Sequence, residues 1–299
     1  MNKVVYTCIC GEYDSLVRQR YYSPDYDYVC FTDNTDYLQK GNACGWKILP
    51  LAFDELDNTR NNRWHKFHPH ILFPGYDISI YIDANINILS SWLFELFEQS
   101  GKDLMLQHHH CRSCVYDEAE LIKEIGKDTP ENVDKMLAVL AKNGMPKNYG
   151  LTENNIICRR NTPLCRKIME DWWGFVRDYC KRDQMSLTYV LWRNGIRIED
   201  ISFDNLRYKN RNVFCPFEHI PYVSLREKAA GRVSCGNQII FYFLGLPILK
   251  IKVKPNKRLF YFGGIKVLSE KTDKTVSRFY LLGFIFVFCK KHKTREDGK

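Results

Sequence analysis

Residues 1 to about 200 alternate short apolar runs with longer stretches in which apolar residues recur at helical spacing. The apolar runs predict buried strands over Lys3–Ile9, Asp27–Thr32, Trp46–Leu49 and Ile78–Ile82. The helical stretches begin after Ser90-Ser91, Thr129 and Thr162, where a capping hydroxyl or a Thr-Pro pair stands. Because strands and helices alternate, we expect an α/β fold in which helices flank a mainly parallel sheet.

After about Cys235 the pattern changes to an imperfect repeat. Clusters of the order aromatic, glycine, aliphatic recur around Gly245, Gly263 and Gly283, each flanked by Lys or Arg. Each cluster is shorter than the roughly 20 apolar residues that cross a bilayer. We therefore divide the chain into a domain over 1–235 and a tail over 236–299. We favour a membrane-surface anchor for the tail, and the alternative is a β-rich subdomain with a solvated basic rim.

Composition assigns the basic charge to this tail. The formal net charge is +9, and residues 236–299 contain 14 of the 44 Lys and Arg but only 4 of the 35 Asp and Glu. The rest of the chain is close to neutral, so we expect no nucleic-acid partner for it. The 12 cysteines are scattered, and the N-terminus lacks a long apolar signal core, which indicates a reduced, cytosolic setting.

One predicted strand runs directly into two oxygen-bearing side chains, Asp83 and Asn85. Ligands collect at the carboxyl edge of a parallel sheet, and a carboxylate with an amide there suits a divalent cation that carries phosphates. Asp and Asn also end strands in simple turns, so the pair alone is weak evidence. Upstream, Arg63, Lys66 and His70 share one face if their segment is a single helix. Such a face suits a diphosphate, or it is an ordinary solvated surface.

Three further clusters carry candidate chemistry. Strand alternation would direct His108 and His110 into the same crevice, where they could position an acceptor, bind phosphate or complete a metal site. Zinc ranks low because the possible ligands are crowded into one short segment. Glu153 precedes an apolar strand together with two asparagines, which could bind sugar hydroxyls. Asp183 and Gln184 start a helix, where Asp183 is either an N-cap or a contact to a sugar donor.

Taken in order, these segments resemble a glycosyltransferase family formerly known as a domain of unknown function, with bacterial members and plant TOD/MUCI-type members linked to cell-wall polysaccharides. The resemblance covers residues 3 to about 195, and the order is more specific than any single motif. The segments are Val5-Tyr6-Thr7, Gly11-x-Tyr13-Asp14, Cys30-Phe31-Thr32-Asp33-Asn34, Arg63-x-x-Lys66-x-x-x-His70, Tyr81-Ile82-Asp83, His108-His109-His110-x-Arg112, Tyr116-x-Glu118, Glu153-Asn154, Arg159-Arg160-Asn161 and Arg182-Asp183-Gln184.

The resemblance implies a GT-A like, Rossmann-type fold that binds a nucleotide diphosphate sugar. By that resemblance the nucleoside is held by Tyr6, Thr7 and Asp33, the diphosphate and a Mn²⁺ or Mg²⁺ ion by Asp83 and Asn85, and the sugar by Asp183 and Gln184. Asn85 stands where the family usually has a second carboxylate. The loss of that negative charge predicts weaker metal binding or none.

We therefore hypothesise a hexosyltransferase that uses a nucleotide sugar, with UDP-sugars as the preferred donors, and a saccharide or lipid-linked saccharide acceptor in surface polysaccharide, lipopolysaccharide or capsule synthesis. Glu153 or Asp183 would stabilise the positive charge that develops on the sugar or accept the acceptor's proton. The tail resembles the ends of bacterial lipopolysaccharide and capsule transferases, which implies a cytoplasmic protein at the inner face of the inner membrane. The alternatives are a non-catalytic membrane- or nucleic-acid-binding protein and a nucleotidyltransferase on the same fold.

Overall fold

The computed structural model describes residues 1–203, 214–216, 219, 222, 230–235, 238–244, 246–254, 257–272, 276–281 and 285–291. The chain forms two compact units, Met1–His219 and Ile220–Lys299. The boundary expected at residue 235 therefore lies too late. It falls inside the hairpin of β11 (Ala230–Cys235) and β12 (Gln238–Phe243), because the second unit begins before the repeated clusters that suggested the boundary.

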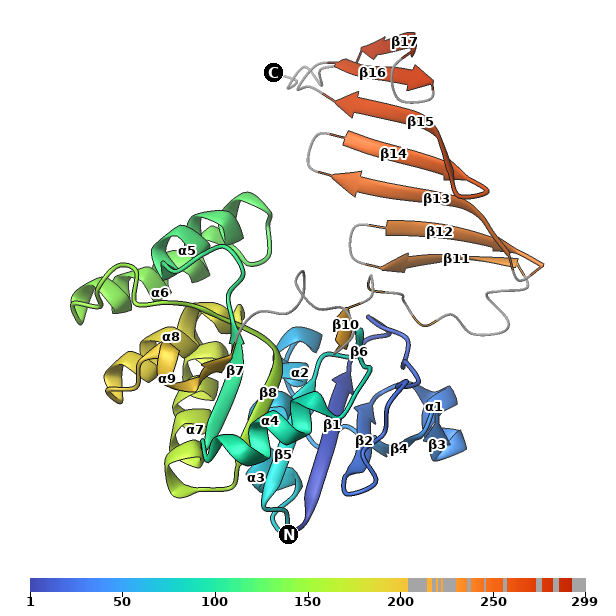
Figure 1. Ribbon diagram of the computed structural model, residues 1–299. Helices are drawn as coiled ribbons and strands as arrows, with labels where there is room; N and C mark the ends of the chain where they lie inside the picture. Colours follow the sequence, from blue (N-terminus) through green and yellow to red (C-terminus); the bar gives the residue numbers. More distant parts are fainter. Residues whose placement is uncertain are drawn as a thin grey trace. The chain divides into compact units, whose positions relative to one another are not determined.

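The first unit is built on an eight-stranded mixed sheet with the order β3-β4-β2-β1-β5-β8-β7-β9 (Figure 1). Its strands are β1 (Lys3–Ile9), β2 (Asp27–Thr32), β3 (Asn42–Ala43), β4 (Trp46–Pro50), β5 (Ile78–Ile82), β7 (Leu104–His108), β8 (Thr152–Arg160) and β9 (Ser202–Phe203). Strands β4, β2, β1 and β5 pair in parallel, whereas β8 is antiparallel to both of its neighbours. The four strands predicted from apolar runs and the mainly parallel α/β class are confirmed. A short pair, β6 (Ile86–Ile88) with β10 (Phe214–Pro216), lies outside this sheet.

Helices alternate with the strands of the first unit. They are α1 (Thr35–Lys40), α2 (Asn58–Phe67), α3 (Pro69–Leu72), α4 (Trp92–Ser100), α5 (Val115–Glu124), α6 (Pro130–Lys142), α7 (Pro163–Asp178), α8 (Asp183–Arg193) and α9 (Ile198–Ile201). The predicted starts of α6 and α7 are confirmed, since the hydroxyls of Thr129 and Thr162 accept backbone N–H groups of the first turn. The single helix expected over Arg63–His70 is wrong. It stops at Phe67 because Pro69 disfavours helical geometry in the residue before it, and His70 lies in α3.

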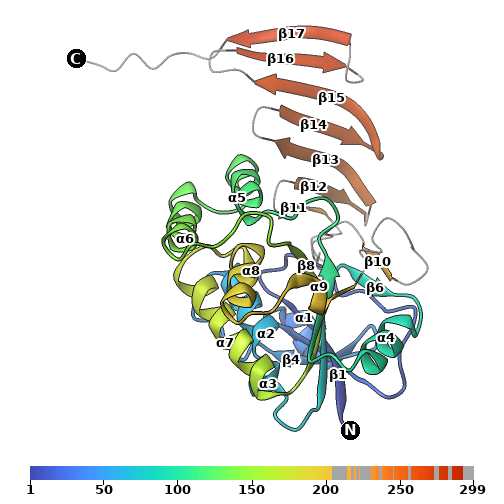
Figure 2. The same cartoon turned by 60° about the vertical axis from the view of Figure 1, so that its left-hand side comes forward.

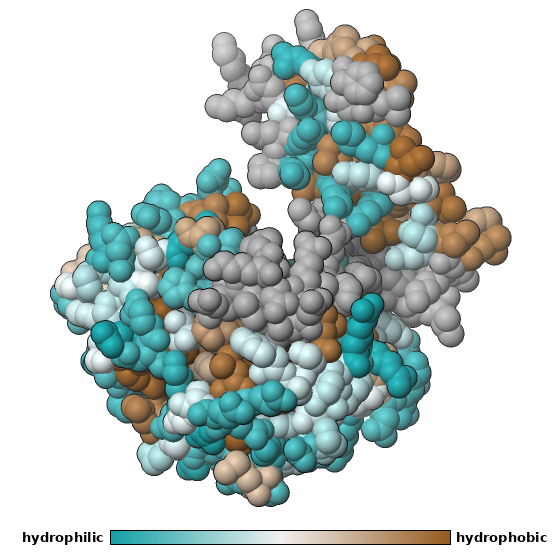
Figure 3. All heavy atoms as spheres, in the orientation of Figure 1, coloured by the Kyte–Doolittle hydropathy of each residue, from teal (hydrophilic) through white to brown (hydrophobic). Residues whose placement is uncertain are grey.

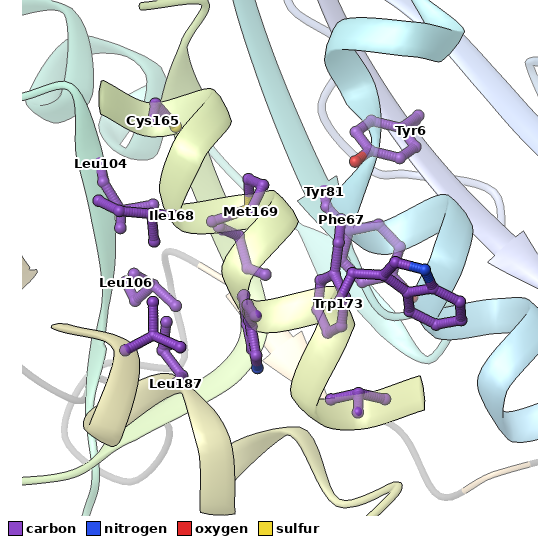
Figure 4. Close-up of a cluster of buried hydrophobic side chains, with 14 of the residues drawn as sticks. Tyr6, Phe67, Tyr81, Leu104, Leu106, Cys165, Ile168, Met169, Trp173 and Leu187 are labelled. Atoms are coloured by element: carbon purple, nitrogen blue, oxygen red, sulfur yellow. The ribbon is translucent and has the colours of Figure 1, made fainter. Parts of the chain in front are cut away.

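The main core lies between α2, α7, α8 and one face of the sheet, and Figure 4 shows part of it. The rings of Phe67 on α2 and Trp172 on α7 stack with their centroids 4.0 Å apart. A buried cation crosses this core, because the Arg159 guanidinium donates to the hydroxyl of Tyr6 over 2.7 Å and to the carbonyl of Lys66 over 2.6 Å. Burial raises the pKa of Tyr6, and Arg159 opposes that rise only in part. Tyr6 is therefore a neutral core residue that accepts from a charged donor.

The second unit is a seven-stranded antiparallel sheet whose strands follow one another in sequence order, from β11 through β13 (Leu246–Lys254), β14 (Lys257–Phe262), β15 (Ile265–Thr272), β16 (Val276–Leu281) and β17 (Ile285–Lys291) (Figure 2). This is the β-rich arrangement that the sequence left as an alternative. A β-bulge recurs at Phe241/Tyr242, Phe260/Tyr261 and Phe279/Tyr280. Successive bulges are 19 residues apart, so the imperfect repeat in the sequence corresponds to a regular repeat of the structure. Within the described residues, no helix combines the length and the apolar character needed to cross a membrane.

A buried histidine ties the segment after β4 to α2. His65 is fully buried, its Nε2 accepts the N–H of Ala52 over 2.8 Å, and its Nδ1 lies 2.8 Å from the carbonyl of Asn61. Only a neutral ring can accept at one nitrogen and donate at the other. Burial lowers the pKa of His65 from 6.5 to about 4. The fold therefore requires His65 without its second proton.

We predict that the first unit loses stability as the pH falls from about 6.5 to about 4. Across this window His65 binds a proton in the unfolded state but not in the folded state. Its contribution should therefore lower the free energy of unfolding by about 1.4 kcal/mol for each pH unit that the pH falls. Urea unfolding followed by tryptophan fluorescence measures this, because all 6 tryptophans precede residue 220. His65→Gln should reduce the pH dependence by about one proton, whereas the partly exposed control His70→Gln should not. An unchanged dependence in His65→Gln would contradict the assignment.

Candidate active site

A cleft of about 570 Å³ opens at the carboxyl edge of the parallel strands in the first unit. Its lining comes from the ends of β1 and β5, the segment after β7, the start of β8, one face of α2, and the segments that follow α5 and precede α8. Lys66, Asp83 and Asp183, which lie far apart in the sequence, all line it. The predicted edge of the sheet is therefore a concave site lined mostly by polar residues.

The floor of the cleft contains a buried ion network. Lys66 Nζ lies 2.8 Å from Asp183 Oδ2 and 3.7 Å from Asp83 Oδ1, and Arg63 Nε lies 3.0 Å from Asp183 Oδ2. The side chains of Lys66 and Asp183 are only 1% and 4% exposed, whereas that of Asp83 is 30% exposed. The Lys66 ammonium also sits 5.1 Å from the centre of the Tyr81 ring. Of the two carboxylates, Asp83 is the one that a ligand in the cleft can reach.

Burial and neighbouring charges shift the pKa values of this network in opposite directions. Burial alone would raise the pKa of Asp183, but Arg63 and Lys66 outweigh it and hold the pKa well below its usual range. Burial lowers the pKa of Lys66, and Asp183 and Asp83 oppose that fall. Asp183 is therefore an anion that two cations compensate. A carboxylate held this way is a poor proton acceptor.

Of the two roles that the sequence left open for Asp183, this arrangement excludes the N-cap. Arg182 is the N-cap of α8, and Asp183 is the first helical residue, with no side-chain cap hydrogen bond at that end. The side chain of Asp183 points to Lys66 and Arg63 on α2 instead. Sequence-local rules favour a cap for an Asp at a helix start, and here two buried cations from another helix compete successfully for it.

Asp83 and Asn85 flank a turn between β5 and β6, and both line the cleft. The N–H of Asp83 donates to the carbonyl of Asn155 on β8, which fixes the turn against the sheet. One reachable carboxylate and one amide form an oxygen donor set of low charge. This set fits a hydrated Mn²⁺ or Mg²⁺ ion whose remaining ligands come from a diphosphate, because Mg²⁺ usually keeps waters and substrate oxygens in its shell.

The segment after β7 brings a histidine and a buried carboxylate together. His110 Nδ1 lies 2.5 Å from Glu153 Oε1, and His110 Nε2 lies 3.2 Å from Cys111 Sγ. Glu153 is 5% exposed. His109 accepts the backbone N–H groups of Cys111 and Arg112 at Nδ1, so it organises this segment. His109, His110 and Cys111 are close enough to share a metal ion, but these hydrogen bonds already occupy ring nitrogens of both histidines.

Three cations gather beside the start of α8. Lys127, Lys181 and Arg182 line the cleft and form no ion pair with a carboxylate in the described part of the chain. Burial and the charge of Arg182 lower the pKa of Lys127. Asp128 accepts the backbone N–H of Lys181 over 2.7 Å and so fixes this loop against α6. A group of cations of this kind is ready to receive a multiply charged anion.

Five residues that were predicted to contact the ligand do not line the cleft: Tyr6, Thr7, Asp33, His70 and His108. Tyr6 and Thr7 are fully buried in β1 and do not line the cleft. His70 binds Glu170 over 2.8 Å and lines a separate small cavity. His108 does not line the cleft, because β7 ends there and strand alternation no longer governs the residues that follow; His109 and His110 face the cleft instead. The fifth residue is Asp33.

Asp33 holds the segment that follows β1. Its carboxylate accepts the N–H of Gly11 at 2.8 and 3.1 Å. Gly11 has φ +63°, and an added Cβ would lie 1.9 Å from the amide nitrogen of Asn58. The left-handed φ and the close approach of Asn58 favour glycine at this turn, which forms part of the cleft wall. Asp33 therefore shapes the cleft through Gly11.

Several residues that line the cleft were not predicted from the sequence. Lys127, Lys181 and Arg112 were not singled out as ligands, and Asn154 was named only with its neighbours. The Asn154 amide nitrogen is buried with no hydrogen-bond partner within the described structure, and it lies at the cleft. The run Lys181-Arg182 before Asp183 was a usable signal, whereas a lone Lys127 in a loop gives none.

Comparison with known proteins adds one match. The sequence model of a family described as TOD1/MUCI70, glycosyltransferase-like domain, matches residues 1–214. No protein with a curated function matches the chain. The matched range contains the whole eight-stranded sheet and all of the cleft-lining residues discussed above, and it ends before the second unit.

We expect Asp183→Ala to reduce the free energy of unfolding of the first unit by about 3–5 kcal/mol, because it leaves Lys66 and Arg63 buried without their main anion. Tryptophan-detected urea unfolding measures the loss. The matched control is Asp178→Ala, which breaks an exposed pair with Arg177 and should cost less than about 1 kcal/mol. Replacing Lys66 by Met together with Asp183 by Leu should recover part of the loss. Equal losses for the two alanine variants would show that the buried network does not stabilise the fold.

Proposed function

The chain belongs to the TOD1/MUCI70 glycosyltransferase-like family, and we propose that it transfers a hexosyl group from a nucleotide diphosphate sugar, with UDP-sugars as the preferred donors, to a saccharide hydroxyl. Family membership supports a glycosyltransferase that takes a sugar donor and an acceptor. The donor, the acceptor and the GT-A mode of donor binding are part of the proposal. A glycan of surface polysaccharide, lipopolysaccharide or capsule is the proposed acceptor.

The observation that carries the proposal is the cleft itself. A reachable carboxylate, Asp83, faces the same concave space as Lys127, Lys181 and Arg182, which lack carboxylate partners in the described structure. The volume of about 570 Å³ lies within the range of roughly 300–1,000 Å³ that is usual for small-molecule ligands. A cation-rich wall opposite an oxygen donor set suits a diphosphate whose negative charge grows as it leaves the sugar.

We assign the diphosphate to the three cations of the loop before α8 and of the segment after α5. Asp83 and Asn85 would hold a divalent ion against the same phosphates. When bound, such an ion stabilises the charge on the departing diphosphate. Lys66 and Arg63 act differently from the initial hypothesis, because Asp183 already occupies them; they keep α8 in place and contribute their positive field to the cleft.

Asp183 and Gln184 begin α8 at the edge of the space where the donor sugar would lie. Gln184 Oε1 accepts a hydrogen bond from Arg182 over 3.0 Å, which orients its amide group. The low pKa of Asp183 makes it an electrostatic group for the developing positive charge on the sugar rather than a base.

We assign the proton transfer to His110 with Glu153. If His110 donates its Nδ1–H to Glu153, its Nε2 is left as an acceptor that lies 3.2 Å from Cys111 Sγ. An acceptor hydroxyl that takes the place of this thiol contact could pass its proton to Nε2 as the new bond to the sugar forms. Glu153 then stabilises the charged imidazolium, in the manner of a carboxylate that orients a catalytic histidine. Asn154, with its buried amide donor at the cleft, is a candidate contact for a sugar hydroxyl.

The first test of the proposal is nucleotide release from a panel of UDP-sugars, measured with and without Mn²⁺. We expect UDP as the product, and we expect Asp83→Ala to reduce its release by at least about 100-fold, because the diphosphate loses a group that binds its counter-charge. The exposed control Asp171→Ala should keep full activity. Full turnover by Asp83→Ala would remove the proposed role. Release of pyrophosphate would instead identify nucleotidyl transfer on this fold.

A second test separates proton transfer from diphosphate binding. His110→Gln should lower kcat by about 100-fold or more while leaving the Kd for UDP unchanged, because general-base catalysis contributes about that much. Lys181→Gln should weaken UDP binding and leave kcat at saturating donor nearly constant. Steady-state kinetics and calorimetric titration with UDP provide the two values. Identical effects of the two substitutions on kcat and on Kd would refute this division of roles.

A further inference from the structure

Alternate turns of the seven-stranded sheet lie at the same end of it. Each strand reverses the direction of the one before, so the turns β12–β13, β14–β15 and β16–β17 share one end, and the turns between them share the other (Figure 1). We call the residues that flank the first three turns the apolar tips. The apolar tips consist, in the described part of the chain, of Phe243, Leu244 and Leu246, of Phe262 and Ile265, and of Leu281, Ile285, Phe286 and Val287.

Large hydrophobic side chains are exposed at all three apolar tips. Leu244 is 77% exposed, Ile265 is 68% exposed and Phe286 is 56% exposed. Figure 3 shows hydrophobic residues of this sheet gathered along one of its ends. The opposite end differs, because Lys254 and Lys257 flank the β13–β14 turn there. Monomeric soluble proteins seldom leave several large apolar residues exposed in one place, and such a surface is usually an interaction site.

A basic row lies directly behind the apolar tips. The strand register places Lys250 opposite Tyr261 and Tyr261 opposite Lys266, so these side chains stand side by side on one face. Lys252 and Lys254 share that face of β13, because residues two apart on a strand point the same way, but they lie toward the opposite end of the sheet. The basic row behind the tips therefore consists of Lys250 and Lys266. The surface therefore presents apolar residues at its end and positive charge immediately behind them.

We propose that the apolar tips insert into the headgroup region of an anionic lipid bilayer while the basic row contacts the lipid phosphates. Strands in a sheet are about 4.8 Å apart, so tips on every second strand stand roughly 10 Å from one another in a line. Equivalent tips at one end of the sheet can contact a surface together, and the charge behind them is complementary to anionic headgroups. A second copy of this chain is a poorer occupant, because two basic rows would face each other.

This proposal goes beyond the proposed function, because it concerns residues outside the family match and requires no catalysis. If the chain does not bind vesicles, the transferase proposal still stands. If Asp83→Ala keeps full activity, the proposal of lipid binding still stands. The two are therefore tested independently.

Co-sedimentation of the full chain with vesicles tests the proposal. We expect binding to vesicles of phosphatidylcholine mixed with phosphatidylglycerol, weaker binding to phosphatidylcholine alone, and weakening by salt. Replacing Leu244, Ile265 and Phe286 together by Ser should reduce binding at least 10-fold. The matched control replaces three exposed hydrophobic residues of the first unit, Leu56, Ile71 and Leu164, by Ser and should bind as the wild type does.

Two further variants keep the test decisive if the triple tip variant folds poorly. Lys250→Gln with Lys266→Gln should remove the preference for anionic vesicles. Ile265→Trp should bind more tightly, and brominated lipid should quench its added fluorescence, because Trp favours the membrane interface. Absence of vesicle binding, or equal binding by the wild type and the tip variants, overturns the proposal. A dimer in light scattering that the tip substitutions dissociate, without vesicle binding, would identify a second copy as the occupant and also overturns it.

Discussion

The pairing of Lys66 with Asp183 is the constraint on which the site depends. It joins helices whose contacting residues are 117 positions apart, and both side chains are removed from water almost completely. A buried charge without its partner costs several kcal/mol, so α2 and α8 have little freedom to separate. That fixed spacing holds Gln184, Arg182 and the neighbouring Lys181 at one wall of the cleft and leaves Asp83 reachable at the floor. Charge balance inside the protein thus determines which charges remain for a ligand.

The chain separates its two kinds of surface chemistry. The first unit is close to neutral overall and concentrates its charges in one concave site at the sheet edge. The second unit has the excess of Lys and Arg and exposes its apolar residues at strand ends. A glycosyltransferase needs a site for its sugar donor and access to its acceptor. The separation of the charged cleft in the first unit from the basic, apolar surface of the second unit agrees with these two requirements.

Local patterns predicted the strands and helix starts well, because apolar runs and Thr-Pro starts are decided within a few residues. They also brought Asp83 and Lys66 to one sheet edge. The errors came where a distant partner or an element's end decided the outcome. Pro69 ends α2, so His70 lies in α3 and away from the cleft. Because β7 ends at His108, His109 and His110 line the cleft instead. The carboxylate of Asp183 pairs with cations of α2 instead of capping α8. The place of Lys127 in the cleft could not be predicted, because only the folded chain brings it beside Arg182.

The bulge at every Phe-Tyr pair makes the second sheet a ladder of equivalent 19-residue rungs. A rung consists of two strands and so returns the chain to the same direction and the same end. Duplication or deletion of one rung would therefore preserve the strand register and the alignment of the remaining tips, much as in other proteins built from nearest-neighbour repeats. Relatives could lengthen or shorten this sheet by whole rungs, which would adjust the number of contact points without any change to the fold of the transferase domain.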